Sequence, residues 1–508
     1  MSKKLEILYA AAEMVPFAKV GGLADVAGAL PRELARLGNR VGVFLPLYPG
    51  VRKQKGLDLE LLVKLRIQLG GRTLAGAVHR ADLGDGLAVY FLENDALYDR
   101  PNPYVDPQTG KDWPDNAERF AFYCRALLET CAVREWAPDV LHLNDYQAGL
   151  VAPLLREEYA RGPLAKTACI YSIHNLGYQG IFPQDGVPPS MYELAGLLGL
   201  DRNLLYAMGP LEYYGRLNFT KAAVVYSDLI VAVSPTYAQE IQTPEFGFGL
   251  DGVLRARTDR VIGILNGIDA ETWNPATDPL IPHNYGPSDF PGKAENKARL
   301  LEAMHLPQDL RVPVIGIISR LVDQKGFDLI EAVADDLFRE LDVRLVVLGT
   351  GMPKYEQLLR DLAKRYPDRV AVEIGFNDPL AHLIEAGSDF FLMPSRYEPC
   401  GLNQMYSMRY GTVPIVRATG GLADTVIEFD PRTGTGTGFA FEEYEPAALR
   451  AAIERALAVF AKPKPWKALV TRIMGLDFSW NRAAREYERA YARAMRMRTE
   501  SVEAGSAG

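Results

Sequence analysis

The sequence predicts an α/β protein with two domains, each built on a largely parallel sheet. Short apolar runs alternate with longer helix-like stretches along the 508 residues, which is the pattern of βα units. In the second half these runs are rich in β-branched residues and carry little polar alternation, as expected of strands buried on both faces. A Pro-, Asn- and Asp-rich stretch at 266–289 indicates a loop between the halves.

The elements follow in chain order. Strands are expected at 5–10, 41–47, 88–92, 140–144, 168–173 and 229–233, with one long helix at 116–134. In the second half, strands are expected at 314–319, 344–348, 370–374, 390–393 and 413–416. We place the domain boundary near residue 262, giving domains 1–262 and 263–478, and expect a last helix at 479–499. Residues 500–508 are small and polar, which predicts a disordered tail.

Composition excludes several classes of protein. The AVILMFWYC residues make up 48% and charged residues 24%, which is typical of a globular protein and not of a disordered, fibrous or coiled-coil chain. The net charge of −8 gives no global basic surface, so we expect neither a nucleic-acid nor a membrane partner. No apolar run approaches the ~18–20 residues of a membrane helix, and no signal peptide is evident. A cytoplasmic location follows as an expectation.

Metal chemistry is also not expected. The four cysteines have no CxxC spacing, and the six histidines form no HExxH motif. Few cysteines in so long a chain suggest a reducing compartment.

The segment Gly-Gly-Leu-Ala-Asp occurs twice, at 21–25 and at 420–424. Each copy follows an expected strand and opens an apparent helix. Glycines allow close backbone approach, and the free amides of a first helical turn attract an anion. Two such helix starts facing one cleft would suit a diphosphate; two unrelated Gly-Gly helix starts are the alternative.

Three cations lie near expected strand ends. Lys19 precedes the first Gly-Gly, and neither a Walker loop nor GxGxxG is present there, so a solvated surface role is the alternative. Arg320 and Lys325 follow the strand at 314–319, at the edge where parallel sheets bind ligands. Two cations there could hold a pyrophosphate, although each could equally be a surface ion-pair partner.

Other polar residues also end expected strands. Glu398 lies between two prolines in the segment 394–402, where it could accept hydrogen bonds from sugar hydroxyls or simply form a cap or salt bridge. Asp145 and His174 follow strands of the first half and are expected to point into the same cleft. A structural role is the alternative for His174.

Together these segments resemble the ADP-glucose-dependent glycogen and starch synthases of bacteria and plants, over nearly the whole chain. The matching segments are 19–23, 115–120, 174–180, 232–237, 266–269, 293–297, 319–326, 394–402 and 419–422. The resemblance implies two facing Rossmann-like domains, the GT-B fold, with the last helix crossing back to the N-terminal domain. It also implies a retaining glucosyltransferase that needs no cofactor or metal and acts on ADP-glucose and an α-1,4-glucan.

The resemblance also implies roles for individual residues. Lys19, Arg320 and Lys325 would contact the diphosphate, assisted by the amides of Gly21, Gly22, Thr419, Gly420 and Gly421. Glu398 and Asn266 would hold the glucose, with His174 and Asp145 beside the anomeric carbon and acceptor, and Phe376 on the adenine. Substrate-binding positions further include Asp25, Tyr104, Cys400, Gly401 and Leu402.

Two positions depart from the family pattern. Many members have His-x-His-Asp-Trp-His where this chain has His142-Leu143-Asn144-Asp145-Tyr146-Gln147. Tyr146 keeps an aromatic ring, so we expect a sugar-stacking platform there. Many related transferases also carry a glutamate where this chain has Tyr406, so we assign no ribose-binding glutamate.

No segment supplies an obvious carboxylate for a double displacement, which favours front-face attack with the leaving phosphate accepting the proton. Three alternatives remain: a transferase of the same architecture with another donor or acceptor, a sugar-nucleotide epimerase, and a non-catalytic glucan-binding scaffold. Oligomeric state is not determined by the sequence.

Overall fold

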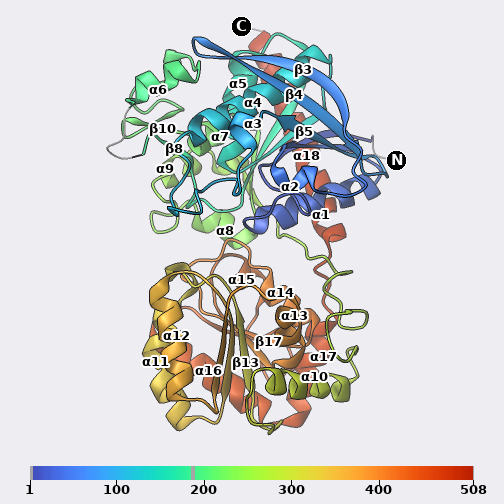
Figure 1. Cartoon of the computed structure of the whole chain (residues 1–508), viewed down its shortest axis with the longest axis vertical. Coiled ribbons are helices and arrows are strands. Elements are labelled where there is room, and N and C mark those ends of the chain that lie inside the picture. The colour runs from blue at the N-terminus through green and yellow to red at the C-terminus, as the bar shows by residue number, and fades with distance from the viewer. Residues whose placement is uncertain (1–3, 185–188, 507–508) are drawn as a thin grey trace. The chain divides into compact units, whose positions relative to one another are not determined.

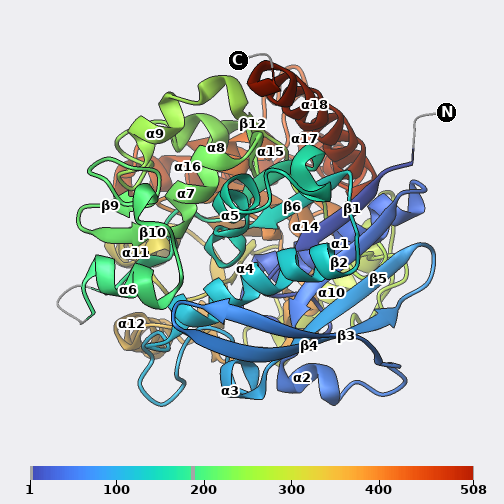
Figure 2. The same cartoon turned by 90° about the horizontal axis from the view of Figure 1, so that it is seen from above.

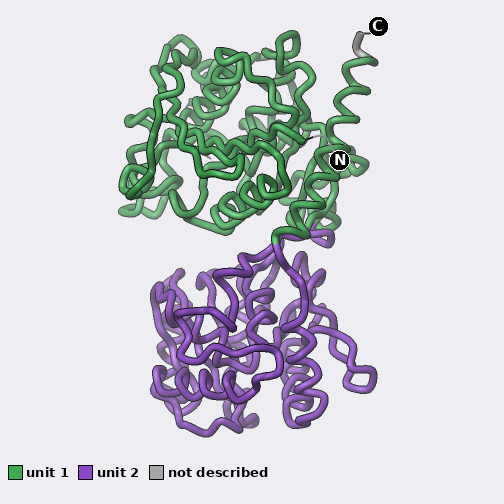
Figure 3. Tube along the Cα trace, turned by 90° about the vertical axis from the view of Figure 1, so that its right-hand side faces the viewer, with its two compact units in different colours: residues 1–233, 238–264, 480–508 green, residues 234–237, 265–479 purple. Residues whose placement is uncertain are grey.

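The computed structural model describes residues 4–184 and 189–506. The chain divides into two compact units, coloured separately in Figure 3. Unit 1 contains the chain up to Val233, residues Ala238–Ile264 and the segment from Trp480; unit 2 contains Ser234–Tyr237 and Leu265–Ser479. The main division after residue 264 lies two residues from the boundary placed near 262.

Unit 1 is built on a nine-stranded sheet in the order β12-β11-β7-β6-β1-β2-β5-β4-β3. The parallel strands are β1 (Glu6–Ala10), β2 (Arg40–Pro46), β5 (Leu87–Glu93), β6 (Val140–Asn144), β7 (Ala168–Ile173), β11 (Leu229–Ala232) and β12 (Val261–Gly263). All are short, and all except β12 are mostly buried. Their order reverses between β1 and β6.

An antiparallel hairpin, β3 (Glu60–Leu69) and β4 (Arg72–Asp82), extends this sheet beyond β5 (Figure 2). Neither strand of this hairpin was predicted from the sequence. Gly70-Gly71 between two extended stretches was the available signal, because such a dipeptide is typical of a two-residue hairpin turn.

The long helices of unit 1 are α1 (Gly22–Arg36), α4 (Asn116–Val133) and α18 (Trp480–Ser506). Shorter ones are α2 (Pro49–Arg52), α3 (Asp95–Tyr98), α5 (Val151–Glu157), α6 (Met191–Leu197), α7 (Phe219–Tyr226), α9 (Asp251–Arg255) and α8 (Pro235–Glu240), which spans the division between units. The 3-10 turns are η1 (Tyr146–Ala148), η2 (Pro163–Lys166), η3 (Arg202–Leu204) and η4 (Thr258–Arg260). A small second sheet comprises β8 (Ile181–Phe182), β9 (Glu212–Tyr213) and β10 (Arg216–Asn218).

Helix α18 returns the chain to unit 1 after unit 2 is complete, as expected. Its buried residues repeat at helical spacing and join the unit 1 core: Trp480, Ala483, Ala484, Tyr487, Ala490, Tyr491 and Ala494. Small alanines on this stripe allow α18 to pack closely on α1 and β7. The tail prediction was wrong for 500–506, because α18 continues to Ser506; residues 507–508 lie outside the described part.

Unit 2 contains a six-stranded parallel sheet in the order β15-β14-β13-β16-β17-β18. Its strands are β13 (Val314–Ile318), β14 (Arg344–Gly349), β15 (Val370–Ile374), β16 (Phe390–Met393), β17 (Val413–Arg417) and the unpredicted edge strand β18 (Phe439–Phe441). This is the Rossmann order, with its reversal between β13 and β16. The parallel sheets of both units confirm the predicted α/β class.

Helices cover both faces of the unit 2 sheet; Figure 1 shows α11 and α12 on one side and α10 and α13 on the other. The helices are α10 (Phe290–Ala303), α11 (Phe327–Glu340), α12 (Pro353–Arg365), α13 (Asp378–Gly387), α14 (Asn403–Arg409), α15 (Gly420–Thr425), α16 (Pro446–Phe460) and α17 (Pro463–Met474), with the 3-10 turn η5 (Asp323–Lys325). Within residues 4–184 and 189–506, none of the helices combines the length and apolar character that a membrane span requires.

Candidate active site

The strand reversal of unit 2 brings together two of the segments selected from the sequence. Arg320 and Lys325 follow β13, while Ser395 and Glu398 follow its sheet neighbour β16. Open parallel sheets bind ligands beyond the carboxyl ends of the strands at such a reversal. These four side chains and nearby backbone line a cavity of about 210 Å³. Unit 2 therefore has a candidate ligand site at the expected edge.

Lys325 and Glu398 form a short ion pair in this cavity, with 2.5 Å between Nζ and Oε2. Ser395 Oγ donates to the same carboxylate oxygen at 3.0 Å. The lysine and glutamate side chains are only 18% and 9% exposed, so solvent screens the pair weakly. Arg320 also lines the cavity and is exposed, so its charge is accessible to an anion.

Two glycines allow the loops around this cavity to touch. Gly326 has a φ of 77°, and a Cβ there would overlap the carbonyl oxygen of Pro394. Gly420 has a φ of 46°, and a Cβ there would overlap the carbonyl oxygen of Glu398. The second Gly-Gly motif thus packs against the backbone of the loop that carries Glu398.

The amides of the Gly-Gly segments require a correction. Thr419 N donates to Arg417 O at 3.0 Å, and Gly421 N donates to Glu398 O at 3.2 Å. Gly21 N donates to Glu13 Oε2 at 2.8 Å. These three amides donate to acceptors within the protein. In this conformation they are therefore not free to bind a diphosphate, contrary to the prediction.

The remaining predicted residues of unit 2 differ in position. Gly401 and Leu402 line the cavity, and the neighbouring Cys400 is buried, which raises the pKa of its thiol to about 12. Asn266 is also buried, and its Oδ1 has no hydrogen-bond partner among the described residues. Such an orphaned oxygen fits a ligand hydroxyl. Phe376 is 97% exposed on the loop after β15, two strands away from β13.

The strand reversal of unit 1 lies between β1 and β6, and the loop after β1 is organised by Glu13, which sequence reasoning missed. Its carboxylate accepts hydrogen bonds from Val20 N at 2.5 Å, Gly21 N at 2.8 Å and Tyr104 Oη at 2.8 Å. Burial raises the pKa of Glu13, and these donors oppose the shift. The sequence signal for Glu13 was its position shortly before Lys19 and the Gly21-Gly22 pair. Glu13 therefore holds the Lys19–Gly22 loop and Tyr104 together.

Lys19 and Asp25 pair with each other at the start of α1, 2.7 Å apart between Nζ and Oδ1. The lysine side chain is 56% exposed, so the pair contributes at most about 1 kcal/mol to stability. Gly21 and Gly22 are exposed as well, with open space where their Cβ atoms would lie. The helix start is therefore accessible, and Lys19 can exchange Asp25 for an anion at little cost.

Asp145 and His174 lie together, just after β6 and β7. Asp145 has a φ of 51°, and its Oδ1 accepts a hydrogen bond from His174 N at 2.8 Å. A positive φ at a non-glycine residue costs about 1–3 kcal/mol and is typical of functional sites. Burial raises the pKa of Asp145 to about 7 and lowers the pKa of His174 to about 4. His174 is therefore neutral at pH 7.

Asn144, at the departure from the family pattern, orients His174. Its Nδ2 donates to Ala10 O at 2.9 Å, which directs Oδ1 toward Tyr9 Oη at 2.9 Å and His174 Nε2 at 2.8 Å. An amide oxygen only accepts hydrogen bonds, so Nε2 carries the proton. Nδ1 of His174 is then an acceptor. The hydrogen bond between Asn144 and His174 was not predictable from their separation in the sequence.

Helix α18 contacts β6, the strand that ends at Asn144. His142 on β6 is fully buried between Tyr491 Oη on α18, at 2.8 Å from Nδ1, and Ser172 Oγ, at 2.7 Å from Nε2. Burial holds the pKa of His142 well below its usual value. The C-terminal helix is thus part of the scaffold of β6, which ends at Asn144.

Both aromatic departures from the family pattern are packed inside their units. The Tyr146 ring is buried and contacts Phe120 and Phe182, with centroid distances of 5.6 and 6.2 Å. The expectation of an open stacking platform at Tyr146 therefore needs correction. The Tyr406 ring stacks on Trp273, with 4.2 Å between the ring centroids.

Comparison with known proteins identifies the family. Residues 6–256 match the family model described as the starch synthase catalytic domain, and residues 305–467 match glycosyl transferases group 1. The glycogen synthase of Syntrophotalea carbinolica is 47% identical over 97% of this chain and 99% of its own length. The chain belongs to the glycogen and starch synthase family. It is a glycosyltransferase.

Other relatives agree with this assignment. The glycogen synthase of Koribacter versatilis is 46% identical over 97% of this chain and 99% of its own length. The solved catalytic domain of starch synthase IV from Arabidopsis thaliana, bound to ADP and acarbose, is 35% identical with a TM-score of 0.85, covering 97% of this chain and all of that one. The predicted GT-B fold and the family resemblance are confirmed.

Proposed function

We propose that this glycosyltransferase moves glucose from ADP-glucose to the non-reducing end of an α-1,4-glucan, with retention of anomeric configuration. The cavity at the strand reversal of unit 2 carries the proposal, because it combines Arg320, Lys325 and Glu398. Two cations suit the diphosphate of a nucleotide sugar, and a buried carboxylate suits sugar hydroxyls. The plant relative whose structure contains ADP and acarbose supports ligands of these two classes.

In the proposed reaction the bond between the anomeric carbon and the diphosphate oxygen breaks first. Negative charge grows on the diphosphate as the glucosyl group gains oxocarbenium character. Fixed cations stabilise that charge without reorganisation, which is worth about 2.7–4 kcal/mol for one group. Lys325 is held in position by Glu398 and is therefore preorganised. Arg320 would bind the same diphosphate, and Phe376 would stack on the adenine.

Retention is proposed to arise from front-face attack, with the leaving phosphate accepting the proton of the acceptor hydroxyl. Four carboxylates near the proposed sites already accept hydrogen bonds: Glu398 from Lys325 and Ser395, Glu13 from Tyr104 and two amides, Asp145 from His174 N, and Asp25 from Lys19. Such groups are poor nucleophiles. Neutral His174 would present Nδ1 to a sugar hydroxyl, and Asn266 would bind another.

Incubation of the purified protein with labelled ADP-glucose and glycogen tests the proposal. Incorporation of label into α-1,4-linked chain ends, with the α-configuration confirmed by NMR, is expected. A parallel reaction with UDP-glucose decides the donor. Free sugar nucleotide of changed configuration without glucan extension would indicate an epimerase. Glucan binding with no consumption of either donor would indicate a scaffold and overturn the proposal.

A further inference from the structure

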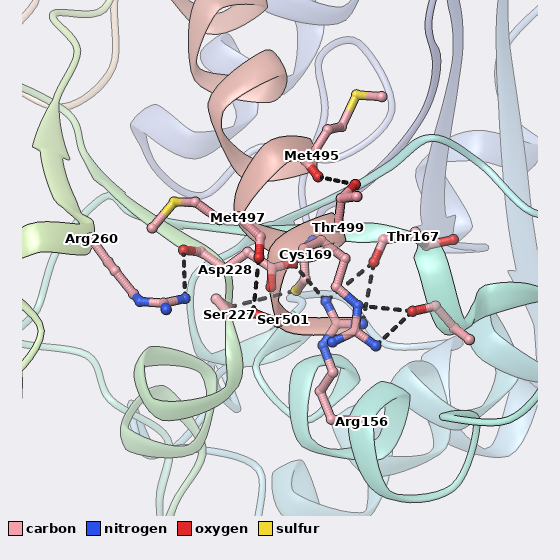
Figure 4. A network of polar contacts seen from close by, with 12 residues as sticks. Arg156, Thr167, Cys169, Ser227, Asp228, Arg260, Met495, Met497, Thr499 and Ser501 are labelled. Atoms are coloured by element: carbon pink, nitrogen blue, oxygen red, sulfur yellow. Dashed lines mark hydrogen bonds and ion pairs between the residues drawn. The ribbon is translucent and has the colours of Figure 1, made fainter. Parts of the chain in front are cut away.

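A second cavity lies in unit 1, away from the elements that carry Glu13, Asp145 and His174. It has a volume of about 320 Å³, at the lower end of the about 300–1,000 Å³ typical of small-molecule sites. Four arginines from three parts of the chain line it: Arg156 on α5, Arg257 and Arg260 beside η4, and Arg498 on α18. We call it the arginine cavity; Figure 4 shows part of its polar network.

The acidic residues lining the arginine cavity neutralise only part of this charge. Asp228 is buried and pairs with Arg156 at 2.6 Å. Asp259 is exposed and lies 3.8 Å from Arg260 Nε. Among the described residues, these two are the carboxylates that line the cavity. Four guanidinium groups therefore face two carboxylates, which leaves two positive charges uncompensated.

The other two arginines are held by neutral backbone carbonyls. Arg257 donates to the carbonyl oxygens of Val225 and Ser227, while its buried Nε has no partner among the described residues. Arg498 donates from Nε and Nη2 to Ala165 O, at 2.8 and 2.6 Å. A carbonyl orients a guanidinium group but does not cancel its charge.

The charges also affect one another. Burial, followed by the neighbouring Arg260 charge, lowers the pKa of Arg257. Burial, followed by the Arg156 charge, lowers the pKa of Arg498. The guanidinium groups thus repel one another, and a bound anion would relieve the repulsion.

We propose that the arginine cavity binds a small phosphate-bearing dianion, either inorganic phosphate or a sugar monophosphate. Guanidinium groups match phosphate oxygens with paired N–H donors. A phosphate monoester carries a charge of about −1.5 to −2 at pH 7, which would balance most or all of the two excess positive charges of the cavity. The ligand would join η4 to the C-terminal part of α18. Of these two elements, η4 lies just before the passage of the chain between the units at 264–265, whereas the passage at 479–480 is at the other end of α18.

Hydrogen exchange measured by mass spectrometry tests this site directly, because it reports where a ligand acts. The probes are inorganic phosphate and fructose 6-phosphate, compared with sodium chloride at matched ionic strength. Saturating ADP is added so that phosphate does not act through the proposed donor site. We expect saturable protection of peptides covering 255–260 and 493–504. Stronger protection by fructose 6-phosphate than by inorganic phosphate would identify a sugar phosphate as the ligand. Equal protection by the two probes would show that the cavity recognises only the phosphate group.

Arg260→Gln should weaken phosphate binding at least about tenfold, since a lost hydrogen bond to a charged group has this effect. Arg260→Lys should restore part of it. Arg40→Gln is the matched control, because Arg40 is an exposed unit 1 arginine paired with Glu6 and does not line the cavity. No phosphate-dependent protection, or equal protection in Arg260→Gln, would overturn the proposal. Neither result depends on whether the chain uses ADP-glucose.

Discussion

Replacement of Lys325 by methionine separates the catalytic role proposed for this lysine from its structural role. Methionine keeps much of the side-chain volume but removes the charge that pairs with Glu398 at 2.5 Å. If the charge stabilises the leaving diphosphate, turnover should fall about 10²–10³-fold, as for other single stabilising donors. The Michaelis constant for glucan should change little.

The same substitution should also lower stability. Removing one partner of a buried ion pair typically costs about 3–5 kcal/mol, because the other charge is left without compensation. Ser395 Oγ still donates to Glu398 at 3.0 Å, so we expect a value near the lower limit, about 3 kcal/mol. For a domain of this size that corresponds to a fall of roughly 6–12 °C in the unit 2 transition.

Initial rates of glucose incorporation and scanning calorimetry measure the two effects. Lys325→Met combined with Glu398→Gln should recover most of the stability but not the turnover, because the buried charge is gone while the cation is still missing. Lys354→Met is the matched control: this lysine forms an exposed pair with Asp323, so its loss should leave both stability and turnover close to those of the parent. Near-normal turnover in Lys325→Met would refute the assignment.

Three further predictions concern pH, metal and α18. Burial raises the pKa of Asp145 to about 7, so the folded state binds more protons than the unfolded state between about pH 4 and 7. Its contribution to stability therefore falls as pH rises through this window, and Asp145→Asn should be more stable than the parent at pH 8 but not at pH 4 in urea titrations. Transferase activity should persist after exhaustive chelation, and loss of activity rescued by magnesium or manganese would contradict this; the described residues contain no cluster of three or more potential metal ligands. Tyr491→Phe should lower the free energy of unfolding by about 1–3 kcal/mol, because His142 Nδ1 loses its partner in a buried site; unchanged urea midpoints would show that the contact is unimportant.

Much of the fold was predictable because parallel strands carry local signals. Apolar, β-branched runs such as β13 and β14 must be buried on both faces, and the polar segments between them mark the connections. The hairpin β3–β4 was missed because its half-exposed strands have weaker hydrophobic patterns. The edge strand β18 is mostly buried but only three residues long, which is too short for a clear pattern. The tail was misjudged at 500–506, where small polar residues continue α18 because the preceding stripe is anchored in the core.

By itself, the sequence determined which residues follow strand ends, because chain order and the rule for parallel sheets suffice to place Arg320, Lys325 and Glu398 at one edge. Only the tertiary structure decided what those residues contact. Hydrogen bonds across large sequence separations depend on side-chain direction, as between Glu13 and Tyr104 or between His142 and Tyr491. Such contacts have no local signature, because they arise from the packing of elements rather than from their spacing in the chain.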